Sequence, residues 1–79
     1  MPLEWAKVDD YHIASTCGRY TVSRVNTGAH VHYIAWRRQP PLELGEVCLL
    51  SDCTHDERVD AIKRMRQACA DHSESLAAR

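Results

Sequence analysis

The sequence predicts an α+β domain in which a four-stranded antiparallel sheet is followed by one C-terminal helix that packs on one sheet face. Residues 11–37 alternate apolar and polar side chains, as strands of a half-buried sheet do. Gly18 and Gly28 interrupt this stretch where tight turns need a positive φ angle. Residues 54–72 change to the spacing of an amphipathic helix.

Residues 11–37 are expected to form a three-stranded meander. Two-residue loops at Cys17–Gly18 and Thr27–Gly28 set Ile13 opposite Val22, and Val22 opposite Tyr33. Because side chains alternate between faces along a strand, this register divides them into two sets. The expected core face carries Tyr11, Ile13, Tyr20, Val22, Val31, Tyr33 and Ala35, with Arg24 at its edge. The opposite face carries His12, Ala14, Thr21, Ser23, Val25, His30, His32, Ile34 and Trp36.

The segments on either side of the meander are expected to close the sheet. Residues 3–8 favour a short edge segment, with Trp5 covering one end of the core. Pro40 and Pro41 interrupt strand pairing because proline has no backbone N–H, so residues 38–45 are expected to be a loop. Residues 46–50 are expected to form a short fourth strand. Its inward pair is either Val47 with Leu49 or Cys48 with Leu50.

The helix is expected to begin at Thr54, because Thr54 and Glu57 match a capping box. Its apolar stripe consists of Val59, Ile62, Met65 and Cys69, with Ala61 and Ala68 beside it. The opposite side carries Arg58, Lys63, Arg64 and Arg66. We expect the helix to end near His72, so the ordered part of this single domain runs from about residue 3 to 72, with residues 73–79 as a frayed tail.

Composition excludes several functional classes. Ten basic and eleven acidic residues give a net charge of −1, so no overall field attracts the chain to nucleic acid or an anionic membrane. No stretch approaches the ~20 apolar residues of a membrane span. Residues 1–10 lack the basic and apolar regions of a signal peptide. We therefore expect a cytoplasmic protein whose four cysteines are reduced.

Four cysteines and five histidines raise the question of a metal site. The most suggestive group is Cys48, Cys53, His55, Cys69 and His72. Its spacing does not match the closely paired ligands of structural zinc sites, and buried cysteine often acts as a small apolar residue. Core cysteines are therefore the preferred interpretation, and we expect neither a metal nor another cofactor.

Three histidines, His12, His30 and His32, share the non-core sheet face in this register. They suggest a metal site or an acid sensor, but no carboxylate is clearly placed to orient their rings, as ligating histidine requires. A solvated sheet face is the preferred interpretation. Cys17 near His12 resembles a nucleophile beside a base, yet the sequence contains no catalytic motif. We therefore expect no catalytic residues and no enzymatic activity.

Two surfaces remain as candidate partner-binding sites. The open sheet face offers His30, His32 and Trp36, and tryptophan is enriched among the residues that dominate binding energy at interfaces. The outer face of the helix offers the second set, Arg58, Lys63, Arg64 and Arg66. The basic residues of the helix also suggest contacts with nucleic-acid phosphates, but Asp56, Glu57 and Asp60 reduce the net positive charge of the helix.

Several short motifs resemble a group of known proteins. They are W-x-x-V at Trp5–Val8, Y-x-I at Tyr11–Ile13, G-R-Y-T-V at Gly18–Val22 and Y-x-A-W at Tyr33–Trp36. Together with a closing alanine-containing helix, they are similar to small uncharacterised proteins of phages and prophages in Gram-negative bacteria, over roughly residues 5–72. This chain departs from that pattern in its longer, cysteine-bearing segment 39–54 and its more basic helix.

The resemblance implies a small non-enzymatic phage or mobile-element protein that binds and blocks one host protein in the bacterial cytoplasm. Phage accessory proteins of this size often act by stoichiometric binding, and anti-CRISPR proteins are similar in size and compactness. A subunit of a CRISPR-Cas complex is therefore the specific partner considered. The alternatives are a nucleic-acid-binding module that uses the basic helix face and Trp36, a structural phage component, and a homodimer formed through the open sheet face.

Overall fold

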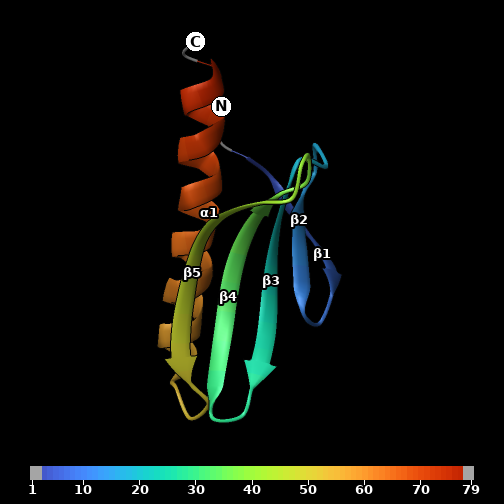
Figure 1. The fold of residues 1–79 in the computed structure, drawn as a ribbon. Coiled ribbons are helices and arrows are strands. Elements are labelled where there is room, and N and C mark those ends of the chain that lie inside the picture. Colours follow the sequence, from blue (N-terminus) through green and yellow to red (C-terminus); the bar gives the residue numbers. More distant parts are fainter. Residues whose placement is uncertain (1–2, 78–79) are drawn as a thin grey trace.

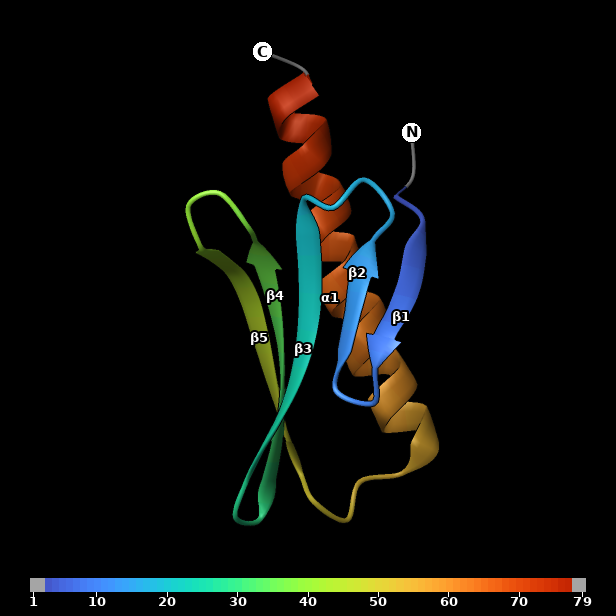
Figure 2. The same ribbon diagram turned by 90° about the vertical axis from the view of Figure 1, so that its right-hand side faces the viewer.

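The computed structural model describes residues 3–77 and confirms the α+β class, with an antiparallel sheet and one C-terminal helix. The elements are β1 (Trp5–Asp9), β2 (His12–Ser15), β3 (Tyr20–Thr27), β4 (His30–Arg37), β5 (Leu42–Leu50) and α1 (His55–Ala77). The strands lie side by side in chain order, each antiparallel to the next (Figure 1). α1 returns along one side of this meander (Figure 2).

The sheet has five strands, so the prediction of four was wrong. The short edge segment expected over residues 3–8 is a full strand, β1, in which Trp5 pairs with Ser15 on β2. A turn at Asp10–Tyr11 joins the two strands without glycine. Instead, the Asp9 carboxylate accepts a hydrogen bond from the Tyr11 backbone N–H at 2.7 Å, which is a side-chain substitute for a backbone turn bond.

The first predicted hairpin register is confirmed, since Ile13 pairs with Val22. The second was wrong by two residues: Val22 pairs with Ala35 rather than Tyr33, because the loop is Gly28–Ala29. A shift of two residues keeps every side chain on its expected face, whereas a shift of one would exchange the faces. Gly28 has the positive φ angle that the turn needs, at 56°.

β5 begins at Leu42, so the predicted loop 38–45 is reduced to residues 38–41. Gly45 lies inside the strand opposite Ala35, next to a bulge where the pairing with β4 shifts. Glycine within a strand often marks such a bulge. The register also decides the inward pair, and the choice is Val47 with Leu49, which pack against the core, whereas Cys48 and Leu50 are exposed.

The capping box at the start of α1 is confirmed. Thr54 Oγ1 accepts a hydrogen bond from the Glu57 backbone N–H at 3.2 Å, and Glu57 Oε2 accepts one from the Thr54 backbone N–H at 3.3 Å. The helix continues to Ala77, five residues beyond the predicted end near His72. Residues 73–77 contain neither glycine nor proline to stop it, whereas residues 78 and 79 of the expected tail lie outside the described residues.

The core lies between α1 and the inner faces of β3, β4 and β5. Its buried members are Tyr20, Val22, Val31, Tyr33, Ala35, Ala61, Met65 and Cys69. Val59 was predicted in the buried stripe but is 49% exposed. It lies about 120° around the helix from Met65, because successive residues turn by about 100°. Tyr11, in the β1–β2 turn, is also 50% exposed, because the backbone of α1 does not come close to β1 or β2.

Candidate functional site

None of the elements in residues 3–77 covers the second face of the sheet (Figures 1 and 2). We call this surface the open face. By strand register, its side chains are His12 and Ala14 from β2, Thr21, Ser23, Val25 and Thr27 from β3, His30, His32, Ile34 and Trp36 from β4, and Glu43, Glu46, Cys48 and Leu50 from β5. The three sheet residues predicted to bind a partner, His30, His32 and Trp36, therefore share this face.

The open face combines accessible apolar side chains with few charged ones. Val25 is 43% exposed and Leu50 is 59% exposed, while Ile34 and Trp36 are half-buried. Glu43 and Glu46 on β5 are the acidic side chains in this set, and the set contains no lysine or arginine. Low charge and exposed apolar or aromatic side chains are typical of the centre of a protein interface.

A row of three side chains in contact with one another crosses β4 and β5 on this face. His32 and Cys48 are directly paired across the strands, and Glu46 lies two residues before Cys48. His32 Nδ1 lies 2.5 Å from Glu46 Oε1, and His32 Nε2 lies 3.7 Å from Cys48 Sγ. The Glu46 carboxylate accepts a hydrogen bond from Nδ1–H of the neutral ring, so the Nε2 lone pair is on the side of the thiol.

This row corrects the expectation that no carboxylate orients the histidines. Glu46 holds His32, and Asp9 Oδ1 lies 2.9 Å from His12 Nδ1. The backbone N–H of Tyr11, followed by the His12 ring, lowers the pKa of the Asp9 carboxyl below its ordinary value. Both partners were hidden in the sequence, because Glu46 reaches His32 only through the β4–β5 register and Asp9 reaches His12 only through the β1–β2 turn.

The three histidines of the open side do not gather at one point. Because of the two-residue register shift, His12 aligns with Ser23 and Ile34 rather than with His32. The ring centres of His30 and His32 are 6.4 Å apart and tilted. Within residues 3–77, no group of three or more potential ligands is placed to hold a metal ion.

The five residues considered for zinc are dispersed. Cys48 lies on the open face, whereas Cys69 is fully buried under the sheet, where burial raises the pKa of its thiol to about 11. His72 Nδ1 hydrogen-bonds with the Tyr20 hydroxyl at 2.9 Å. Cys53 is partly buried between β5 and α1, and His55 is exposed at the first turn of α1. All four cysteines are free thiols.

The four basic residues of α1 do not form one surface. Taking the core direction from Met65, helix geometry places Arg58 about 20° from it, on the sheet side. Lys63 lies about 160° away, and Arg64 and Arg66 lie about 100° to either side. A single flat partner therefore cannot contact all four side chains at once.

Three of these basic groups are also engaged within the chain. Arg58 Nε donates a hydrogen bond to Cys53 Sγ at 3.4 Å. Arg64 pairs with Asp60 at 3.2 Å, and the Arg66 guanidinium lies 5.9 Å from the centre of the Trp5 ring. These contacts make the helix a weaker candidate recognition site than the open face.

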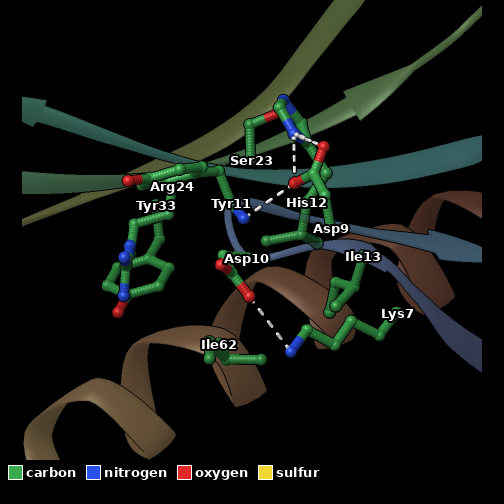
Figure 3. Close-up of a pocket in the computed structure, with 11 residues that line it drawn as sticks. Lys7, Asp9, Asp10, Tyr11, His12, Ile13, Ser23, Arg24, Tyr33 and Ile62 are labelled. Carbon is green, nitrogen blue, oxygen red and sulfur yellow. Dashed lines mark hydrogen bonds and ion pairs between the residues drawn. The ribbon is translucent and has the colours of Figure 1, made fainter.

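A small cavity of about 180 Å³ separates the β1–β2 hairpin from α1 (Figure 3). Its apolar lining is Ile13, Val22, Tyr33 and Ile62. Lys7 and Asp10 form an ion pair at 3.3 Å at its rim. Arg24 also lines it, with its Nε buried and without a hydrogen-bond partner and its guanidinium 5.0 Å from the Tyr11 ring centre. The volume is below the ~300 Å³ of typical ligand pockets, so we interpret the cavity as a gap left where α1 diverges from β1 and β2.

Sequence reasoning missed this cavity because it did not predict β1 as a strand.

Comparison with known proteins finds no matching family model, no matching curated protein and no matching solved structure. The helix in the described part of the chain is too polar to cross a membrane. The candidate function therefore depends on the surface geometry and the sequence resemblance.

Proposed function

We propose that this chain is a small non-enzymatic phage or mobile-element protein whose open face binds one host protein and blocks it. The observation that carries the proposal is that α1 covers one face of the sheet and leaves the other face open. α1 packs against β3, β4 and β5 from one side, while the open face keeps apolar side chains such as Val25 and Leu50 accessible. A chain of this size gains stability by covering apolar area, so a wide uncovered face is consistent with a binding surface.

A folded protein partner fits the open face better than a nucleic acid does. Single-stranded nucleic acid is bound by aromatic platforms within positively charged grooves. Trp36 and the neighbouring histidines supply rings, but none of the lysines and arginines in β1–β5 belongs to the open face. A partner protein with a complementary apolar patch needs no such charge, and Trp36 would be expected to contribute most of the binding energy.

The choice of a host protein comes from the motif resemblance to small phage and prophage proteins. Inhibition by stoichiometric binding needs a folded binding surface and does not depend on catalysis. A CRISPR-Cas subunit in the bacterial cytoplasm is the specific target we propose, because anti-CRISPR proteins share this size and mode of action. A structural phage component is the alternative, and the chain would then be recovered in purified virus particles.

The test is reconstituted binding after affinity capture from the bacterial host. The captured protein is identified, purified and titrated with the wild-type chain and with two variants, Trp36→Ala and the matched control Lys63→Ala. Trp36→Ala should weaken a one-to-one complex by about 30-fold or more, as loss of an interface hot spot does. Lys63→Ala should leave the affinity within about twofold, because Lys63 points away from the sheet.

Two results would overturn the proposal. One is a complex that tolerates Trp36→Ala but is lost on Lys63→Ala, when the melting temperature of each variant shows that it is folded. The other is a capture that retains only chaperones, combined with no effect of the chain on phage survival under CRISPR immunity.

A further inference from the structure

Cys48 and His32 have the geometry of half a zinc site. We propose that Zn²⁺ joins two copies of this chain through their open faces, with Cys48 Sγ and His32 Nε2 of each copy as ligands. The complete site is then a tetrahedral Cys₂His₂ centre, which is a common structural zinc set. This inference concerns a metal site and is independent of the identity of any host partner.

The distance between the two ligand atoms supports the site. Tetrahedral zinc binds thiolate sulfur at about 2.3 Å and imidazole nitrogen at about 2.0–2.1 Å, which separates the two atoms by about 3.5–3.6 Å. Sγ of Cys48 and Nε2 of His32 are 3.7 Å apart. The separation of the two atoms therefore matches that of two ligands bound to one zinc ion.

Glu46 provides the supporting contact that ligating histidines need. In zinc sites the second ring nitrogen usually donates to a carboxylate, which fixes the tautomer and orients the ligating nitrogen. Glu46 Oε1 holds His32 Nδ1 in this way and leaves Nε2 facing Cys48. On binding, each Cys48 thiol releases one proton to solvent and forms a Zn–S bond, while water leaves the ion.

The second copy follows from the ligand count. Within residues 3–77 no third ligand is placed beside this pair, so one chain alone does not complete a zinc site. Two-fold symmetry brings the same patch of both copies together and doubles two ligands to four. The pair is accessible for this, because Cys48 is exposed on the outer surface of β5.

The surroundings of the pair suit contact with a second copy. Val25 flanks His32 on the neighbouring strand, and Leu50 follows Cys48 on β5, with 43% and 59% of their surfaces exposed. When a second copy covers them, these side chains are removed from water, and this burial stabilises the dimer in addition to the metal bonds. Two thiolates neutralise the ion, so the interface centre gains no net charge. A zinc-joined pair also covers the open face, and zinc would therefore control access to it.

The test uses the purified, reduced and metal-free chain, titrated with ZnCl₂ and followed by light scattering after size exclusion. We expect conversion from monomer to dimer at one zinc per two chains, and Co²⁺ in place of zinc should show a thiolate charge-transfer band. Cys48→Ser and His32→Ala should abolish both signals. Glu46→Gln should weaken zinc binding by about 10–100-fold, as loss of such a supporting contact does. Cys53→Ser is the matched control and should dimerise normally.

Three outcomes would overturn the inference. The first is a chain that stays monomeric at saturating zinc. The second is a dimer that forms equally well with Cys48→Ser. The third is a monomer that binds one zinc and loses it in His30→Ala, which would mean that the neighbouring histidine completes the site within one chain. None of these measurements includes a host protein, so their failure leaves the proposed function untouched.

Discussion

The four free cysteines occupy four different environments, and their chemistry should differ accordingly. A hydrogen bond with the Ser15 hydroxyl, followed by the Arg19 backbone N–H, lowers the pKa of the exposed Cys17 thiol. Cys69 is fully buried, and burial raises the pKa of its thiol to about 11. Because the thiolate is the reactive form of cysteine, Cys17 should be the most reactive of the four thiols and Cys69 the least reactive.

We predict that Cys17 is alkylated fastest and Cys69 slowest when the folded chain is treated with iodoacetamide near neutral pH. The rate at each cysteine can be followed by mass spectrometry of peptides taken at successive times. In denaturant the four rates should converge, which serves as the control. Equal rates at Cys69 and Cys17 in the folded chain would contradict the placement of Cys69 in the core.

Cys69 also predicts a pH dependence of stability. Its thiol has an ordinary pKa of 9.0 and a folded pKa of about 11, so the folded state keeps its proton longer than the unfolded state does. The contribution of the Cys69 thiol to the free energy of unfolding is therefore complete below pH 9.0. It falls by about 2–3 kcal/mol as the pH rises through about 11. Urea unfolding of the wild type and of Cys69→Ala at several pH values should show that the difference between their free energies of unfolding becomes smaller across this range. A constant difference would contradict the prediction.

At the scale of single elements, the buried face of α1 is a direct test of helix packing. Met65 is 5% exposed and Val59 is 49% exposed, although both belong to the apolar stripe expected from the sequence. Met65→Asp should cost several kcal/mol or prevent folding, because it buries an unpaired charge. Val59→Asp should change stability by less than about 1 kcal/mol. Similar melting temperatures for the two variants would contradict the observed helix orientation.

Gly45 of β5 faces Met65 and Ala68 of α1. A methyl group built at Gly45 would lie 3.6 Å from Met65 Cε and 3.8 Å from Ala68 Cβ, which are ordinary contact distances. Gly45→Ala should therefore be tolerated, whereas Gly45→Val should destabilise by about 1–3 kcal/mol because the larger side chain overpacks the interface. Chemical denaturation of both variants tests this. Equal destabilisation would mean that the backbone of the bulge, rather than the space beside α1, requires glycine.

The elements that the sequence predicted well are those with local signals. The β2–β4 meander follows from alternating side chains and two glycine turns, and the start of α1 follows from the Thr54–Glu57 capping box. β1 was missed because the Asp9 side chain, rather than glycine, makes its turn. β5 was predicted too short because Gly45 looked like the end of a loop, although it lies within a bulged strand.

The candidate site was predictable only in part, because its chemistry depends on long-range register. His30, His32 and Trp36 were placed on the open face by alternation alone, and that face was correct despite the wrong hairpin loop. The contacts of His32 with Cys48 and Glu46 depend on the alignment of β5 with β4, which no local sequence signal predicts. The basic residues of α1 looked like one face in the sequence, but helix geometry separates them.

At the scale of the whole molecule, the core and the proposed recognition surface lie on opposite faces of one sheet. The core lies entirely between α1 and the inner face, and the open face carries exposed side chains with little part in it. Exposed residues there, such as Cys48 and Val25, can therefore be changed with small effects on stability, within about 0.5 kcal/mol. This separation allows binding variants to be interpreted without the complication of unfolding.

The most direct measurement of the central claim is site-specific photo-crosslinking in the bacterial host. A photoreactive amino acid replaces Ile34 on the open face in one variant and Lys63 on the outer side of α1 in another. We predict that irradiation joins the Ile34 variant to one defined host protein and gives no comparable product from the Lys63 variant. A defined product from position 63 alone would contradict the assignment of recognition to the open face.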